Sequence, residues 1–103
     1  MKKTLVLVLL LAIAVCFGGS AFAQATTSGK VTVLFADPND FVVELDTNGR
    51  CGSAYFHIQR ANANFKEMTA VALTAFTTGK TITFFVASCN SNRNIISHGY
   101  VSR

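Results

Sequence analysis

Charge is scarce in this sequence, and the residue groupings that catalysis and metal binding require are missing. Only 14% of the 103 residues are charged. There is no Ser-His-Asp pattern, no pair of catalytic carboxylates, no glycine-rich phosphate loop and no metal-ligand spacing. We therefore expect no enzyme, no catalytic residues, no metal and no cofactor. The basic residues are scattered rather than gathered in a run, which argues against a nucleic-acid partner.

The first 23 residues follow the order of a cleavable signal peptide. Lys2 and Lys3 precede an apolar run over residues 5–17, and a small-x-small cleavage motif ends at Ala23. The run of about 13 residues is short for a membrane helix, which needs about 20. We expect a secreted or periplasmic protein without a stable membrane span, and a single domain over residues 24–103.

Two alternatives concern this leader. Cleavage after Ala25 satisfies the same motif and would move the mature start by two residues. Lipidation of Cys16 is disfavoured because Val15 is bulky where a lipobox needs a small residue. Removing the leader takes away two of the nine basic residues, and against five acidic residues the mature net charge is about +2.

Two cysteines remain in the mature chain, Cys51 and Cys89. About 80 residues are left without the leader. A domain of that size buries little surface and usually needs a further stabilising feature such as a disulfide. An even cysteine count in an oxidising compartment predicts one disulfide. Closing a loop of about 39 residues would contribute roughly 4 kcal/mol. A metal site or redox pair is the alternative, but neither cysteine has a CxxC partner or clustered His or Asp residues.

Five strands are predicted from runs of alternating or β-branched residues bounded by turn residues. In the first strand, Val31, Val33 and Phe35 should share one face. The Asn48-Gly49 pair is the strongest short hairpin signal and should join the second strand to the third. The five strands are expected over residues 30–36, 41–46, 51–58, 81–88 and 95–101.

Residues 65–78 show helical spacing instead. Asn64 and Glu67 form a capping box at the start of this helix, and Gly79 ends it in a left-handed conformation. The apolar stripe that should pack on the strands comprises Phe65, Met68, Ala72, Ala75 and Phe76.

The predicted element order is β-β-β-α-β-β. This is the order of a small OB-fold-like five-stranded barrel, mainly β with one helix, in which the helix plugs the gap between strands three and four. A ferredoxin-like sandwich would need a helix between strands one and two, and the sequence leaves no room for it.

From the helix onward the chain resembles the B subunits of subtilase-type AB5 toxins, which are related in architecture to pertussis-type B subunits. The similar stretch runs from Phe65 to Gly79 and reads F-x-x-M-x-x-x-A-L-x-x-F-T-T-G, followed by a β-rich strand as in the family. A shorter match is Ser28-Gly29, which leads into the first strand.

The resemblance implies an exported OB-fold subunit that forms a ring, commonly a pentamer with helices lining its centre, and that binds sialylated or related glycans on cell surfaces. It places the glycan-contacting serine on Ser28. The family's acidic residue and tyrosine of the same pocket fall on Gln24 and Val86. The alternatives are a small periplasmic or secreted structural or interaction protein with this fold and no toxin role, and a secreted protease inhibitor.

Four side chains and one loop are further candidates for a site. His57 and His98 could serve as an acid and base, but nothing places them together, so we expect polar positions on a half-exposed sheet. Tyr55 and Tyr100 could stack on a sugar, although we expect aromatics at alternating positions to be core. The amides of residues 90–94 suit carbohydrate hydroxyls, although such loops are usually solvated turns.

Overall fold

Five strands and one helix make up the part of the chain that the structure, a computed structural model, describes. This part is residues 25–103, so the predicted signal peptide lies outside the described residues. The elements are β1 (Ala25–Ala36), β2 (Asp40–Leu45), β3 (Tyr55–Gln59), α2 (Phe65–Thr78), β4 (Thr81–Asn90) and β5 (Arg93–Ser102).

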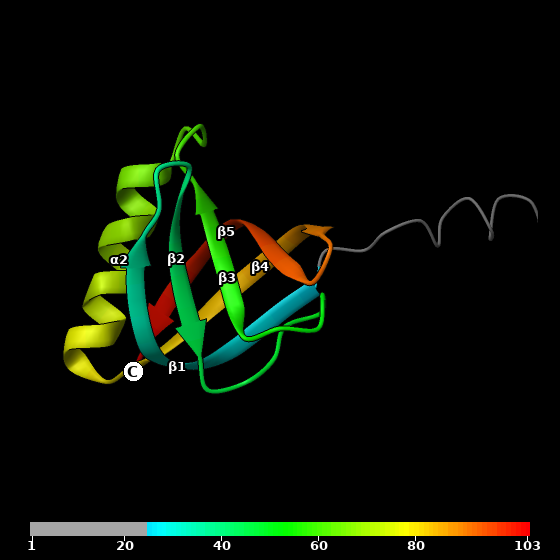
Figure 1. Ribbon diagram of the computed structural model, residues 1–103. Coiled ribbons are helices and arrows are strands. Elements are labelled where there is room, and N and C mark those ends of the chain that lie inside the picture. Colours follow the sequence, from blue (N-terminus) through cyan, green and yellow to red (C-terminus); the bar gives the residue numbers. More distant parts are fainter. Residues whose placement is uncertain (1–24) are drawn as a thin grey trace, which may run out of the picture.

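The strands close into a barrel in the order β1-β2-β3-β5-β4 (Figure 1). The pairing of β3 with β5 is parallel, and the other pairings between the described strands are antiparallel. With the helix inserted between β3 and β4, this arrangement confirms the predicted OB-like fold class. None of the described helical segments has the length and apolar character needed to cross a membrane.

β1 is longer than predicted because it serves two neighbours. Its first half, Ala25 to Lys30, pairs with β4, and its second half pairs with β2. The first half is rich in threonine and serine, so hydrophobic alternation alone did not identify it as a strand.

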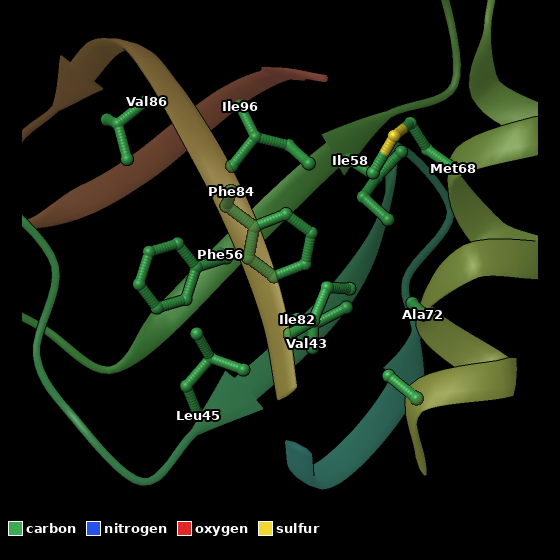
Figure 2. Close-up of a cluster of buried hydrophobic side chains, with 11 residues drawn as sticks. Val43, Leu45, Phe56, Ile58, Met68, Ala72, Ile82, Phe84, Val86 and Ile96 are labelled. Carbon is green, nitrogen blue, oxygen red and sulfur yellow. The ribbon is translucent and has the colours of Figure 1, made fainter. Parts of the chain in front are cut away.

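A single apolar core fills the barrel (Figure 2). At its centre the rings of Phe56 and Phe84 are stacked, with their centroids 5.3 Å apart. Because β-strand side chains alternate between faces, the core residues of β2, β3 and β4 stand at every second position, and α2 and β5 supply the others. The buried cluster consists of Val43, Leu45, Phe56, Ile58, Met68, Ala72, Ala75, Ile82, Phe84, Val86 and Ile96.

The helix has the predicted bounds but differs from the prediction at two positions. The side chain of Asn64 does not cap it and instead donates from Nδ2 to the Ser97 carbonyl at 3.0 Å, so the capping box is wrong. Phe76 is 45% exposed, because only the narrow stripe through Met68 and Ala75 reaches the barrel. Gly79 ends the helix at φ 67°, in the left-handed region, as predicted.

A β-bulge in β1 overturns the predicted faces of that strand. The register against β2 shifts between Val31 and Val33, so Val31 faces the core while Val33 and Phe35 point outward. An extra residue in one strand reverses the facing of everything after it. Leu34 then packs on the core in place of Phe35.

The Asn48-Gly49 pair does not form the predicted tight hairpin. Residues 46–54 make a longer loop, and β3 begins at Tyr55 rather than at Cys51. The glycine is needed for a close approach instead, because a Cβ at Gly49 would lie 2.5 Å from the Asn94 side-chain oxygen. The turn between β4 and β5 is shorter than predicted, since Asn90 and Arg93 pair directly.

We predict that Phe84→Ala lowers the free energy of unfolding by about 3–5 kcal/mol, because it opens a cavity beside Phe56. The matched control is Phe35→Ala, the same substitution at an outward-facing ring, which should cost well under half as much. Urea titration monitored by circular dichroism measures both. Equal losses would contradict the assignment of these two rings to inside and outside.

Candidate functional site

A pocket of about 230 Å³ lies on the outer surface of the barrel. Its lining comes from the end of β1 and the β1–β2 turn, from β3 with the loop before it, and from the β4–β5 hairpin. The lining side chains from β1 and β3 point away from the barrel core. The lining residues are Phe35, Asp37, Ser53, Tyr55, His57, Asn92 and Arg93.

Two aromatic rings form one wall of the pocket. Phe35 and Tyr55 are 39% and 42% exposed. Their rings meet edge to face, with centroids 6.1 Å apart and planes at 72°. Val42, which pairs with both Phe35 and His57 in register, is fully buried although it faces away from the core. A buried apolar side chain therefore lies between Phe35 and His57.

A histidine–aspartate pair lies beside this wall. Nδ1 of His57 is 3.0 Å from Oδ2 of Asp40, and the two side chains are 8% and 16% exposed. A carboxylate only accepts hydrogen bonds, so the proton of this contact is on Nδ1, and in the neutral form of an imidazole the other nitrogen, here Nε2, is an acceptor. No buried side-chain nitrogen or oxygen in residues 25–103 lacks a hydrogen-bond partner, so Nε2, which has none, is open to solvent.

Two charged side chains at the pocket have no partner in the described part of the chain. They are the carboxylate of Asp37 and the guanidinium of Arg93. The backbone at Asp37 is nevertheless held in place, because its carbonyl accepts hydrogen bonds from Nε and Nη2 of Arg60 at 3.1 and 2.9 Å. Both charges are therefore available to a ligand.

The β2–β3 loop and the β4–β5 hairpin are tied together behind the pocket. The predicted disulfide between Cys51 and Cys89 is confirmed, with Cα atoms 5.5 Å apart. Ser53 Oγ donates to the Asn92 carbonyl at 2.7 Å. Asn94 is fully buried: its Oδ1 accepts from the Cys51 N–H at 2.9 Å, and its Nδ2 donates to the Ser53 and Tyr55 carbonyls at 2.9 and 2.8 Å.

Ser28 lies elsewhere, on the outer face of β1 where it pairs with β4. Its hydroxyl is 2.7 Å from the Thr83 hydroxyl. Within the described residues it is not part of the pocket lining. Val86, the position of the family's tyrosine, is buried in the core, and Gln24 lies outside the described residues. The ligand role of Ser28 stays a prediction.

Of the other candidates from the sequence, Tyr55, His57 and Asn92 line the pocket, whereas His98 and Tyr100 do not. His98 stacks on Phe85 with centroids 4.1 Å apart, and Tyr100 lies beside the same ring, so His57 and His98 have separate surroundings. Tyr55 and Tyr100 are both exposed, and their expected place in the core is wrong. The core positions of β3 are taken by Phe56 and Ile58, which have the opposite facing.

Sequence reasoning missed the Asp40–His57 pair. The only signal for it is cross-strand: Asp40 pairs with Gln59, which places His57 diagonally across on the same face. This could be found only with the register of β2 against β3 already known. In residues 25–103 no three His, Cys, Asp or Glu side chains gather as a metal site would require.

We predict that Asp40→Ala lowers the free energy of unfolding by about 1–3 kcal/mol, because it leaves the buried His57 Nδ1 without a partner. Asp37→Ala is the matched control and should change stability by less than about 0.5 kcal/mol, since no contact is lost. Chemical denaturation of both variants decides the matter. A loss at Asp37 as large as that at Asp40 would refute the partner assignment.

Comparison with protein-family models and with curated proteins assigns no family to this chain. No protein-family model matches the chain, and no curated protein matches it.

Proposed function

We propose that this protein is an exported, non-enzymatic carbohydrate-binding domain and that the pocket on the outer surface of the barrel is its sugar site. The observation that carries the proposal is the combination of the Phe35–Tyr55 wall with three unpaired polar groups, on Asp37, His57 and Arg93. In OB folds the face of strands two and three, between the β1–β2 and β4–β5 loops, is the usual surface for oligosaccharides and oligonucleotides. This pocket occupies that place.

The chemistry of the pocket suits a sugar. An aromatic wall receives the apolar face of a sugar ring, while a carboxylate and an imidazole nitrogen accept hydrogen bonds from its hydroxyls. The guanidinium of Arg93 donates to hydroxyl oxygens or to a carboxylate. The volume of about 230 Å³ is below the roughly 300–1,000 Å³ of pockets for drug-sized ligands, so one terminal sugar of a glycan is the fitting occupant.

The predicted leader favours export, and the resemblance to AB5 B subunits favours glycan binding at cell surfaces, so the two are compatible with the same class of function. The resemblance, however, points to Ser28 rather than to the pocket. Ser28 pairs with Thr83, and Thr83 pairs with Tyr100, so these three residues share a different part of the outer surface. The two surfaces can be tested separately.

We predict that Tyr55→Ala weakens binding of a sialylated trisaccharide, sialyllactose, by at least about tenfold, which corresponds to about 1.4 kcal/mol. The loss arises because the aromatic wall no longer covers the sugar face. Calorimetric titration, preceded by a glycan array to rank other sugars, is the measurement. Tyr100→Ala is the matched control, because it removes the same ring from the other surface.

The outcomes separate the two surfaces. Binding that survives Tyr100→Ala and Ser28→Ala but not Tyr55→Ala supports the pocket. The reverse pattern supports the surface around Ser28 and overturns the pocket. No binding of the wild-type protein to any sugar on the array would favour the alternative function, an interaction protein with this fold and no toxin role.

The exposed face of α2 supports self-assembly as part of this function. The hydroxyls of Thr69, Thr74 and Thr77 donate to backbone carbonyls four residues earlier, so they offer little to solvent. Beside them Leu73 is 51% exposed and Phe76 is 45% exposed. An apolar helix face of this kind fits the ring that the resemblance implies, with α2 at the contact between subunits.

We predict that light scattering finds a mass near five copies of the mature chain and that Leu73→Glu shifts it to one copy, because a charge would be buried between subunits. Glu67→Lys, at an exposed charged position that lies about 120° around the helix from Leu73, should leave the mass unchanged. A monomeric wild-type protein would contradict the ring proposal. The sugar site would still be tested by the calorimetric titration.

A further inference from the structure

We infer that Asn94 and the Cys51–Cys89 disulfide are positioning residues of the pocket: they set the distance between its walls without contacting the ligand. The predicted effect of these residues on ligand affinity rests on the proposed function. The structural part of the inference concerns only how the β2–β3 loop is held against the β4–β5 hairpin and can be tested without a ligand.

The walls that need positioning belong to two segments far apart in the sequence. Ser53 and Tyr55 come from the β2–β3 loop and the first residue of β3, whereas Asn92 and Arg93 come from the β4–β5 hairpin. The ladder between β3 and β5 consists of only two Cα pairs, Phe56 with Asn94 and His57 with Ile95. So short a ladder leaves the loop before Tyr55 without strand pairing to the hairpin.

Asn94 supplies the missing connection. It is a fully buried polar residue beside an apolar core, and all three of its side-chain hydrogen bonds go to the segment from Cys51 to Tyr55. A buried amide is stable only when its donors and acceptor are paired, and here one residue pairs them all with the opposite wall. Gly49 permits this contact, because any side chain there would collide with the amide.

The disulfide joins the same two segments. Cys51 lies in the β2–β3 loop and Cys89 lies at the end of β4, opposite Asn94 in the ladder with β5. Neither cysteine belongs to the buried cluster in the barrel, although Cys51 packs against its edge. The bond therefore links the loop that carries Ser53 to the strand end that precedes Asn92, whereas the barrel is closed by its own strand pairing. A hydrogen bond from Ser53 Oγ to the Asn92 carbonyl adds a third tie.

The test uses three variants of the full mature chain. Cys51→Ser with Cys89→Ser removes the covalent tie, Asn94→Asp removes the two amide donors while keeping the disulfide, and Ile82→Val is a core control on β4. Amide hydrogen exchange measures how often the backbone of the two walls opens locally. We expect residues 46–55 and 90–94 to exchange at least about tenfold faster in the first two variants, with β1, β2 and α2 unchanged.

Sialyllactose affinity is the second readout. Both wall variants should weaken it by at least about tenfold, whereas Ile82→Val, compared at an equal loss in melting temperature, should leave it unchanged. Should the cysteine variant fail to fold, Asn94→Asp carries the test with the disulfide in place. Uniformly faster exchange, unaltered exchange in the walls, or unaltered affinity would each overturn the inference. If the wild-type protein binds no sugar, the proposed function fails, and the exchange pattern still decides whether these residues position the walls.

Discussion

The parallel contact between β3 and β5 is the link on which the rest of the structure depends. Without it the antiparallel ladders would form an open sheet with two free edges. The contact is short, and its two members from β3 face opposite ways: Phe56 enters the core against Phe84, and His57 turns outward toward Asp40. β3 therefore contributes to both features through neighbouring residues of this contact, because Phe56 fills the closed barrel and His57 lines the pocket.

The element order, the helix and the disulfide could be predicted because their signals are local or nearly independent of geometry. The helix from Phe65 to Thr78 repeats at three and four residues and ends at a glycine, which settles both ends within one short stretch. With the predicted leader set aside, two cysteines remain, and they allow one pairing. The barrel topology followed from the order of elements, since few small folds place one helix between the third and fourth of five strands.

The pocket could not be predicted because each of its parts depends on a contact between distant residues. Phe35 faces outward only because β1 carries an extra residue against β2, and a period-two pattern has no means of revealing that shift. The Asn48-Gly49 pair has the composition of a tight turn. Gly49 instead lies so close to the side chain of Asn94, a residue more than 40 positions away, that no Cβ would fit between them. Asp40 and His57 become neighbours only through the register of β2 and β3.

The bulge in β1 also bears on how such a surface changes in evolution. Most changes to a binding surface replace one side chain at a time and leave the backbone where it was. Here the aromatic character of the pocket depends on the bulge in β1 between Val31 and Val33. Regular pairing of the same residues, without the bulge, would exchange Leu34 and Phe35 between inside and outside with no change in any amino acid. An alignment that tracks only residue identity would overlook this route by which a related chain could gain or lose the pocket.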